Sequence, residues 1–428
     1  MGLSFQTGVS LLGIFTLCLF TLSSQYSVAQ SVVTDGGTNT SVTVSSDGLI
    51  TVGLAPANSA SISHNTFTNF SVQSAGVNLD NSAVAASTIL NEVTSTNKTL
   101  INGPLTVIGA RADVIIANPN GIAVNGGRFQ NTGNLALTTG TVNVDTSGVV
   151  TSTVNTGRIV VGQDGLSGTM DELALISKSL RLLGGISYDL PSDQSHVNVI
   201  TGSSVTTIDR DRGGLGVDGA NALPWALATA GTGDANGNLI VDIANTGSIS
   251  AGRISLTVTD TGAGVRIAGD HMAAAGGFRL TSTGHLEMAD TRVTAKGSVI
   301  VSAASVDLAS AEDARTEIRS NESGVVLIAN AGSVALGQSS VSGVTTASGT
   351  FASDGGVTVR ASENITTTGT EQNRAFVSST IGEDSDAVAN SNVVFVAGGY
   401  IDLSGLDFVT TDDVRMCPSS GFLEPMAA

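Results

Sequence analysis

The sequence predicts an all-β protein built as a parallel β-helix, a solenoid of short strands, and three observations support this fold class. First, 52 of the 428 residues are Gly and only 13% are charged, whereas the exposed faces of soluble helices are rich in Glu, Lys and Arg. Second, short alternating apolar segments are separated by Gly, Asn and Asp. Third, a unit of two such segments recurs, and one unit cannot bury its apolar face alone.

The N-terminal segment, residues 1–29, is predicted to be a signal peptide. Residues 9–22 form an apolar stretch of 14 residues, which suits a signal sequence better than a membrane span. The small residues Ser27, Val28 and Ala29 predict cleavage after Ala29. The residues before the apolar stretch include no Lys or Arg, so an uncleaved anchor or a misassigned start is the alternative.

The second half of the chain shows the repeating unit most clearly. Its predicted inward positions are Phe278, Leu280, Leu286 and Met288, then Val299, Val301, Val306 and Leu308, then Val326, Ile328, Val334 and Leu336, then Val357, Val359 and Ile365, and finally Val394, Val396, Ile401 and Leu403. The units predict stacked coils with insertions between them. A β-sandwich is the competing fold, and residues 171–183 could form either a helix or a strand.

The most informative local pattern is Asn118-Pro119-Asn120-Gly121, followed by Ile122. Asn at the first position, Pro at the second and Gly at the fourth predict a type I turn. The apolar segments DVIIA and GIAV on either side predict two strands that this turn connects.

The stretch RADVIIANPNGIAVNGGRFQNTG around this turn closely resembles the two-partner secretion domain of filamentous-haemagglutinin-like exoproteins. The resemblance covers about residues 31–290. Its further motifs are Ser63-His64-Asn65 with Phe67 and Phe70, Asn81-Ser82, Ile89-Leu90-Asn91-Glu92-Val93, Arg111 and Asp113 in the stretch above, Gly157-Arg158-Ile159 with Gly165-Leu166, and Gly252-Arg253-Ile254 with Gly264-Val265-Arg266-Ile267. Family members often carry a second tetrapeptide, NPNL, before the segment at residue 89, and this sequence lacks it there.

The resemblance implies an elongated right-handed parallel β-helix that crosses the periplasm and outer membrane to the cell surface or the medium. The implied partner is an outer-membrane transporter with POTRA domains. It also implies the organisation of the mature chain: a secretion domain over residues 30–290, further β-helix coils over 291–408 and an irregular tail over 409–428. Residues 118–122 are then either a signal that contacts the transporter or a rigid turn that fixes strand register.

Charge and cysteine content exclude several other classes. Asp and Glu number 36 against 18 Lys and Arg, a net charge of −18, so nucleic acid or an anionic membrane is a poor partner for the folded chain. Cys18 and Cys417 are too far apart in the sequence to suggest a disulfide framework or a CxxC metal site. We therefore expect no metal and no cofactor.

Other candidate sites receive weaker support. Residues 213–218 match one calcium-binding nonapeptide, but calcium rolls need tandem copies. Trp225 could stack on a sugar or lie in the core. The acids that could serve a β-helix polysaccharide enzyme are Asp307, Glu312, Asp313, Glu317 and Glu322, near Arg315 and Arg319 in a polar segment. The four histidines, His64, His196, His271 and His285, have no zinc-protease spacing.

We expect a non-enzymatic adhesin that is secreted or exposed on the surface and that recognises a host carbohydrate or protein receptor. A haemolysin or contact-dependent inhibition toxin with the same secretion domain is the first alternative, and a polysaccharide-degrading enzyme is the second. The sequence after Leu406 shows little strand pattern, which leads us to expect a truncated gene product or a small relative of the longer family members.

Overall fold

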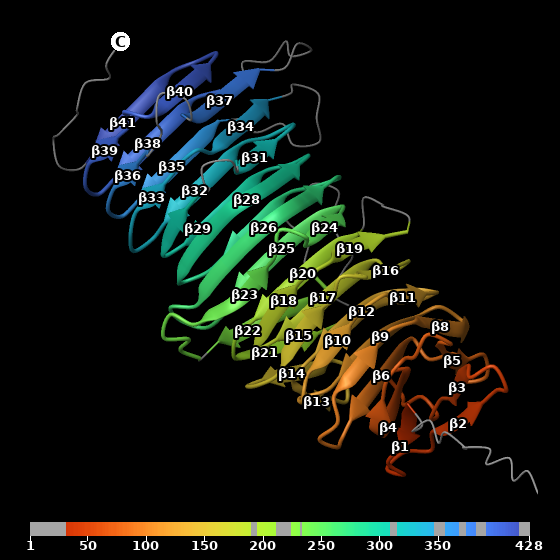
Figure 1. Ribbon diagram of the computed structural model, residues 1–428. Coiled ribbons are helices and arrows are strands. Elements are labelled where there is room, and N and C mark those ends of the chain that lie inside the picture. Colours follow the sequence, from red (N-terminus) through yellow and green to blue (C-terminus); the bar gives the residue numbers. More distant parts are fainter. Residues whose placement is uncertain are drawn as a thin grey trace, which may run out of the picture. The chain divides into compact units, whose positions relative to one another are not determined.

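A computed structural model describes residues 31–189, 195–210, 224–231, 233–308, 315–345, 356–367, 374–381 and 391–418 (Figure 1). All regular secondary structure in these ranges is β-strand. Within the same ranges, no helix is long and apolar enough to cross a membrane. The predicted signal peptide, including Ala29, lies outside the described residues.

The described residues form a right-handed parallel β-helix in which successive coils stack side by side, as Figure 1 shows. Each coil contributes one strand to sheet A, a long sheet in which every pair is parallel except β1 with β4. The strands of sheet A are β1 (Val32–Thr34), β4 (Ile62–Phe70), β6 (Thr88–Val93), β9 (Ala112–Ala117), β12 (Thr132–Thr138), β17 (Glu172–Ser177), β20 (His196–Thr201), β25 (Arg253–Val258), β27 (Phe278–Thr281), β29 (Val299–Ala303), β32 (Val325–Ala329), β35 (Val357–Ala361), β38 (Val393–Ala397) and β41 (Val414–Pro418).

Sheet B provides the remaining faces of the coils, and its pairs are parallel except β2 with β3. Its strands are β2 (Ser41–Val44), β3 (Ile50–Gly53), β5 (Val77–Asn81), β7 (Thr99–Ile101), β8 (Pro104–Gly109), β10 (Ile122–Val124), β11 (Gly127–Gln130), β15 (Arg158–Val161), β16 (Leu166–Gly168), β18 (Ser179–Leu182), β19 (Gly185–Tyr188), β23 (Leu239–Ile243), β24 (Ser248–Ala251), β26 (Gly264–Ala273), β28 (His285–Ala295), β30 (Ser305–Asp307), β31 (Glu317–Ser320), β33 (Val334–Ala335), β34 (Ser340–Thr345), β36 (Ile365–Thr366), β37 (Ala375–Ile381), β39 (Ile401–Asp402) and β40 (Leu406–Thr410).

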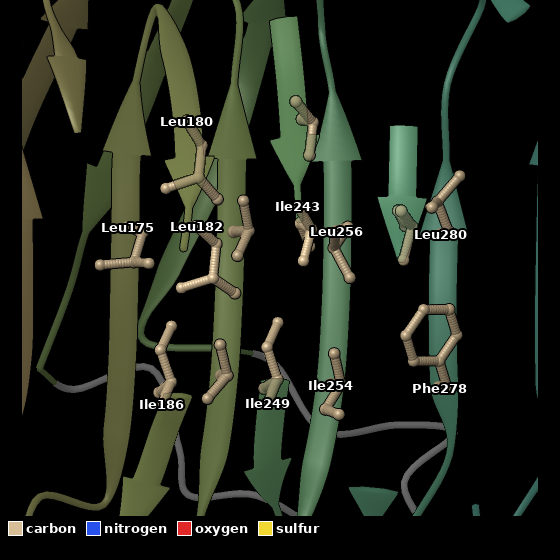
Figure 2. Packing of buried hydrophobic residues seen from close by; sticks show 14 of the residues in the cluster. Leu175, Leu180, Leu182, Ile186, Ile243, Ile249, Ile254, Leu256, Phe278 and Leu280 are labelled. Carbon is tan, nitrogen blue, oxygen red and sulfur yellow. The ribbon is translucent and has the colours of Figure 1, made fainter. Parts of the chain in front are cut away.

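The core fills the interior of the stack with aliphatic side chains. In-register pairs such as Leu175 with Val199 and Leu256 with Leu280 place like residues above one another. Figure 2 shows Leu175, Leu256 and Leu280 of sheet A near residues of sheet B such as Leu180, and all belong to one buried cluster. Because neighbouring strands lie only about 4.8 Å apart, each coil buries its apolar face against the next, which explains why the unit must repeat.

A second, smaller apolar cluster lies on the outer face of sheet A. It is covered by an antiparallel sheet whose strands are β13 (Thr141–Val144), β14 (Val150–Val154), β21 (Ser204–Ile208) and β22 (Ala226–Gly231). Ile115, Ile176 and Ile200 of sheet A pack there with Ile208 and Trp225. Strands β9, β17 and β20 are therefore buried on both faces, which explains why β9 and β17 are apolar at odd and even positions alike.

Residues 171–183, for which a helix and a strand were both open, form strands β17 and β18. Two details differ from the sequence-based expectations. In β32 and β38 the inward residues are Val325, Leu327, Val393 and Phe395, so the predicted inward residues Val326, Ile328, Val394 and Val396 face outward. These two strands are apolar on both faces, and pairing with their neighbours sets the register where alternation does not.

The predicted irregular tail, residues 409–428, is the second difference. Strand β40 continues through Thr410, and β41 pairs with β38 and includes Cys417, which is exposed. The alternation of Val414, Met416 and Pro418 is short and includes few strongly apolar residues, so the pattern alone is weak. The proposed division at residue 290 falls within β28 and stays a prediction.

Candidate functional site

The predicted turn at residues 118–121 follows β9 at a corner of the coil. The Gly121 amide donates to the Asn118 carbonyl over 3.0 Å, which closes a four-residue turn. The φ of Asn120 is not positive, whereas that of Gly121 is +113°, so the turn is not of type II. The backbone N–H of Asn118 also donates to the Thr138 carbonyl of the next coil over 2.9 Å. The turn is thus part of the stack's hydrogen-bond ladder.

The side chain of Asn118 is fully buried and uses both ends of its amide. Its Nδ2 donates to the carbonyl of Asn97 and to Oγ1 of Thr99, each over 2.9 Å. Its Oδ1 accepts hydrogen bonds from the backbone amide and from Nδ2 of Asn120, each over 3.0 Å. One side chain therefore stabilises the turn internally and binds it to the preceding coil.

The other residues of the motif extend this attachment. Nδ2 of Asn120 donates to the Ser95 carbonyl over 2.7 Å. The Thr99 amide donates to the Gly121 carbonyl over 3.1 Å. Ile122 is buried in β10, where it is in register with Thr99 and with Ile159 of the following coil. Only Pro119 and Asn120 are partly exposed, so they are the residues that this turn presents to solvent.

Gly157 of the following coil packs closely against the turn. Its φ is +84°, and a Cβ added there would lie 2.8 Å from the Pro119 carbonyl oxygen and 2.6 Å from Cβ of Thr139. A side chain at this position would be strained in conformation and would clash with backbone. The glycine of the Gly-Arg-Ile motif is thus required by the packing of the turn.

The upstream motif residues lie on β4 and β6, two adjacent strands of sheet A. On the outer face, His64 Nε2 lies 2.8 Å from Glu92 Oε2. On the inner face, Asn65 and Asn91 are in register and fully buried. The structure therefore brings the four residues together as one outward pair and one inward pair.

Arg111 and Asp113 lie farther along, at the start of β9. Arg111 makes a two-pronged contact with Asp171, with Nη1 and Nη2 at 2.9 and 3.0 Å from its carboxylate oxygens, and this pairing raises the pKa of the guanidinium. Asp113 accepts a hydrogen bond from the Asn134 amide over 2.7 Å, and burial raises the pKa of its carboxyl. Arg111 connects the start of β9 to the residue before β17, two strands along sheet A, and Asp113 connects β9 to the next strand, β12, at Asn134.

A buried polar cluster that was not among the predicted sites lies beneath β22. Glu172 is 2% exposed. It accepts hydrogen bonds from Asn198 Nδ2 over 2.9 Å and from the backbone amides of Trp225 and Ala226 over 2.9 and 3.3 Å. His196 Nδ1 lies 3.4 Å from the carboxylate. Burial alone would raise the pKa of Glu172, but the adjacent His196 imidazole, with the Asn198 and Trp225 donors, holds it below its ordinary value.

This cluster anchors the covering sheet to sheet A. A polar residue at an outward position of a strand ordinarily predicts contact with solvent. The one available signal was that DELALIS is apolar at both odd and even positions, which indicates a strand covered on both faces.

The remaining candidates have structural settings. Trp225 is 5% exposed and packs in the outer cluster, so it is a core residue and no sugar platform. Glu317 and Glu322 pair with Arg292 and Lys296, at 3.2 and 3.9 Å. Asp307 lies on β30, whereas Glu312, Asp313 and the glycine-rich residues 213–218 lie outside the described residues.

The four histidines lie on four different strands, β4, β20, β26 and β28. The described ranges contain no group of three or more His, Cys, Asp or Glu residues placed to hold a metal ion. His271 is 2% exposed and lies near Phe278, and burial lowers its pKa to about 4.

Comparisons with known proteins agree with this geometry. A family model described as the TPS secretion domain matches residues 30–288. The tRNA nuclease CdiA of Yersinia mollaretii is 31% identical over 315 residues, which cover 68% of this chain and 10% of that protein. The filamentous hemagglutinin of Bordetella pertussis is 29% identical over 299 residues, which cover 64% of this chain and 8% of that protein.

Among solved structures, a filamentous hemagglutinin secretion domain matches with a TM-score of 0.55 and 28% identity, over 64% of this chain and 93% of that one. The chain spans 10% or less of the length of the two curated relatives. Because the family model covers more than half of the chain and the coils match a solved secretion domain, the chain belongs to the TPS, or two-partner secretion, family of exoproteins.

Proposed function

We propose that this exoprotein is carried across the outer membrane by a dedicated transporter whose periplasmic POTRA domains recognise its N-terminal coils. The observation that carries the proposal is the secretion-domain match over residues 30–288, which comprises the coils around the turn at 118–121. Once outside, the chain acts as an adhesin, and its receptor is a host carbohydrate or protein. The relative named filamentous hemagglutinin supports this activity.

Slow folding would keep the chain able to pass through a transporter. Strands of sheet A pair with partners far along the chain: His196 of β20, for example, is in register with Arg253 of β25. Parallel pairing of this kind requires long connections to close before contacts form, and such topologies fold slowly. The long connections therefore support passage in an unfolded state.

We further propose that residues 118–122 act as a structural clamp in the folded coil. Asn118 and Ile122 are buried, so a transporter could meet their side chains only before the stack forms. The hydrogen bonds of Asn118 to Asn97 and Thr99 support the clamp. His64, Asn65, Glu92, Arg111 and Asp113 are proposed to act similarly, as connections between coils.

A second candidate function is the export module of a contact-dependent inhibition toxin. Relatives named tRNA nuclease and 16S rRNA endonuclease support it, with 31% and 30% identity. Their matched part is 10% and 8% of each protein and corresponds to the secretion domain. The proposed role of this chain in such a toxin is therefore delivery and not catalysis.

Co-expression tests the export proposal. The full chain is expressed with and without its cognate transporter, and the protein in the medium, on the surface and in the periplasm is quantified. We expect release or surface exposure only with the transporter, and retention in the periplasm without it. Equal export in both strains would contradict the proposal. The growth of neighbouring cells that do not express the protein is measured in the same cultures. Inhibited growth would indicate an inhibition toxin, and unchanged growth would agree with an adhesin.

A further inference from the structure

One inward column of sheet A is aliphatic or aromatic along most of its length but begins with two amides. From β9 to β38 its members are in register and 0–1% exposed. In order, the column consists of Asn65, Asn91, Ile116, Leu137, Leu175, Val199, Leu256, Leu280, Val301, Leu327, Val359 and Phe395. The two asparagines thus occupy positions that every later coil through β38 fills with an apolar side chain.

The two amides have opposite surroundings. Oδ1 of Asn65 accepts hydrogen bonds from the Ala55 amide and from Thr40 Oγ1, each over 2.9 Å, and Nδ2 donates to the Ser63 carbonyl over 3.2 Å. Asn65 therefore attaches the first coil to β4. The side chain of Asn91 is equally buried, yet neither Nδ2 nor Oδ1 has a hydrogen-bond partner among the described residues.

An unpaired buried amide destabilises the folded state, because the amide loses its hydrogen bonds to water and gains none in exchange. This loss of stability affects the contacts that β6 makes with its two neighbours, β4 and β9. An apolar residue would fit the column better, as Ile116 shows one strand later. Stability alone therefore does not explain an asparagine at position 91.

We propose that Asn91 is a built-in delay of folding, which keeps the N-terminal coils from closing before the chain has left the periplasm. The inference rests on the proposed export function. In an unfolded chain the amide is hydrated and costs nothing, whereas closing the β4–β6–β9 contact strips that water. Asn91 thus adds a desolvation cost to coil formation, and the apolar residues of the later coils stabilise the finished stack.

The test uses the full chain with Asn91→Val and Asn91→Leu, two residue types that occur elsewhere in the column. The matched control is Asn65→Val, the same substitution at the in-register position of the adjacent strand. Unlike Asn91→Val, it removes an amide that makes hydrogen bonds. Three quantities are measured: the melting temperature, the refolding rate after dilution from denaturant, and the exported fraction in cells that carry the transporter.

We expect Asn91→Val or Asn91→Leu to raise the melting temperature by at least about 2 °C, to speed refolding, and to reduce export. We expect Asn65→Val to lower the melting temperature. A second substitution, Ile89→Ala on the same strand, should slow folding of the Asn91→Val chain again and restore export.

Two results would overturn the proposal. If both Asn91 variants melt at or below the wild-type temperature, the amide does not destabilise the stack. If they are more stable and refold faster but are exported as well as wild type, the amide has no part in export. Wild-type export with and without the transporter is scored separately, so a failure of the proposed function is distinguishable from a failure of this inference.

Discussion

The side-chain amide of Asn118 donates to the hydroxyl of Thr99 over 2.9 Å, so the turn after β9 is bonded to the coil that precedes it. A local turn would stabilise itself only. This hydrogen bond, together with the one to the Asn97 carbonyl, makes the turn a connection between successive coils. The same contact makes the stability of the two coils interdependent.

The first prediction concerns this pair. Thr99→Val keeps the shape of the side chain but removes the acceptor, and we expect a loss of about 1 kcal/mol in the free energy of unfolding. Asn118→Ala should cost more, about 2 kcal/mol or above, because it leaves several buried groups without partners. Urea unfolding of both single variants and of the double variant should give a coupling energy of about 0.5 kcal/mol or more. If the two losses of stability simply add in the double variant, the contact between Thr99 and Asn118 is contradicted. Thr43→Val, at an exposed position, is the control.

The second prediction concerns the Glu172 cluster. Because the folded pKa of Glu172 is lowered, its stabilising contribution is present above the ordinary value of 4.5 and is lost as the pH falls through the lowered pKa. Glu172→Gln should destabilise the covering sheet by roughly 3 kcal/mol and remove this acid dependence. Trp225 is the only tryptophan, so its fluorescence reports this site directly.

The matched control for Glu172 is Glu287→Gln, an exposed carboxylate on β28. It should change neither the stability nor the Trp225 emission at neutral pH. If Glu172→Gln leaves the emission and its pH profile as in wild type, the carboxylate does not anchor β22.

The third prediction concerns His271. Burial lowers its pKa from 6.5 to about 4, so between these values the unfolded chain binds more protons than the folded chain. Stability should therefore be highest above about pH 6.5 and fall as the pH drops to 4, by on the order of 3 kcal/mol. His271→Phe should abolish that slope, whereas His285→Gln, an exposed position, should keep it. An unchanged slope in His271→Phe would contradict the prediction.

The fourth prediction concerns Arg111. Its paired side chains are about half exposed, at 45% for Arg111 and 48% for Asp171, so solvent screens the interaction. Arg111→Ala should cost no more than about 1 kcal/mol, well below Asn118→Ala. Equilibrium unfolding in low and high salt checks this: the difference between wild type and Arg111→Ala should shrink with salt, and a larger loss that salt does not change would disprove it.

The fold class was predictable because the composition and the repeating unit each exclude most alternatives. Phe278 and Leu280 face inward as their spacing indicated. Val326 and Val394 do not, because their strands are apolar at every position and the neighbouring strand sets the register. Alternation specifies a face only where one side of the strand is polar.

The turn at residues 118–121 was also predictable, because Pro and Gly restrict the backbone locally. Its partners were not. Asn97 and Thr99 belong to the preceding coil, and a local sequence pattern carries no information about which coil supplies the acceptors. The Glu172 cluster could not be found for the same reason, since its donors at residues 225 and 226 follow a long insertion.

The most direct test of the clamp at residues 118–122 measures both the stability and the export of Asn118→Ala in the full chain with its transporter. If residues 118–122 act as a clamp in the folded coils, the variant reaches the medium but unfolds at lower urea concentration and is cleaved faster by protease than wild type. A variant that unfolds like wild type yet stays in the periplasm would contradict the account and make the motif a transporter signal.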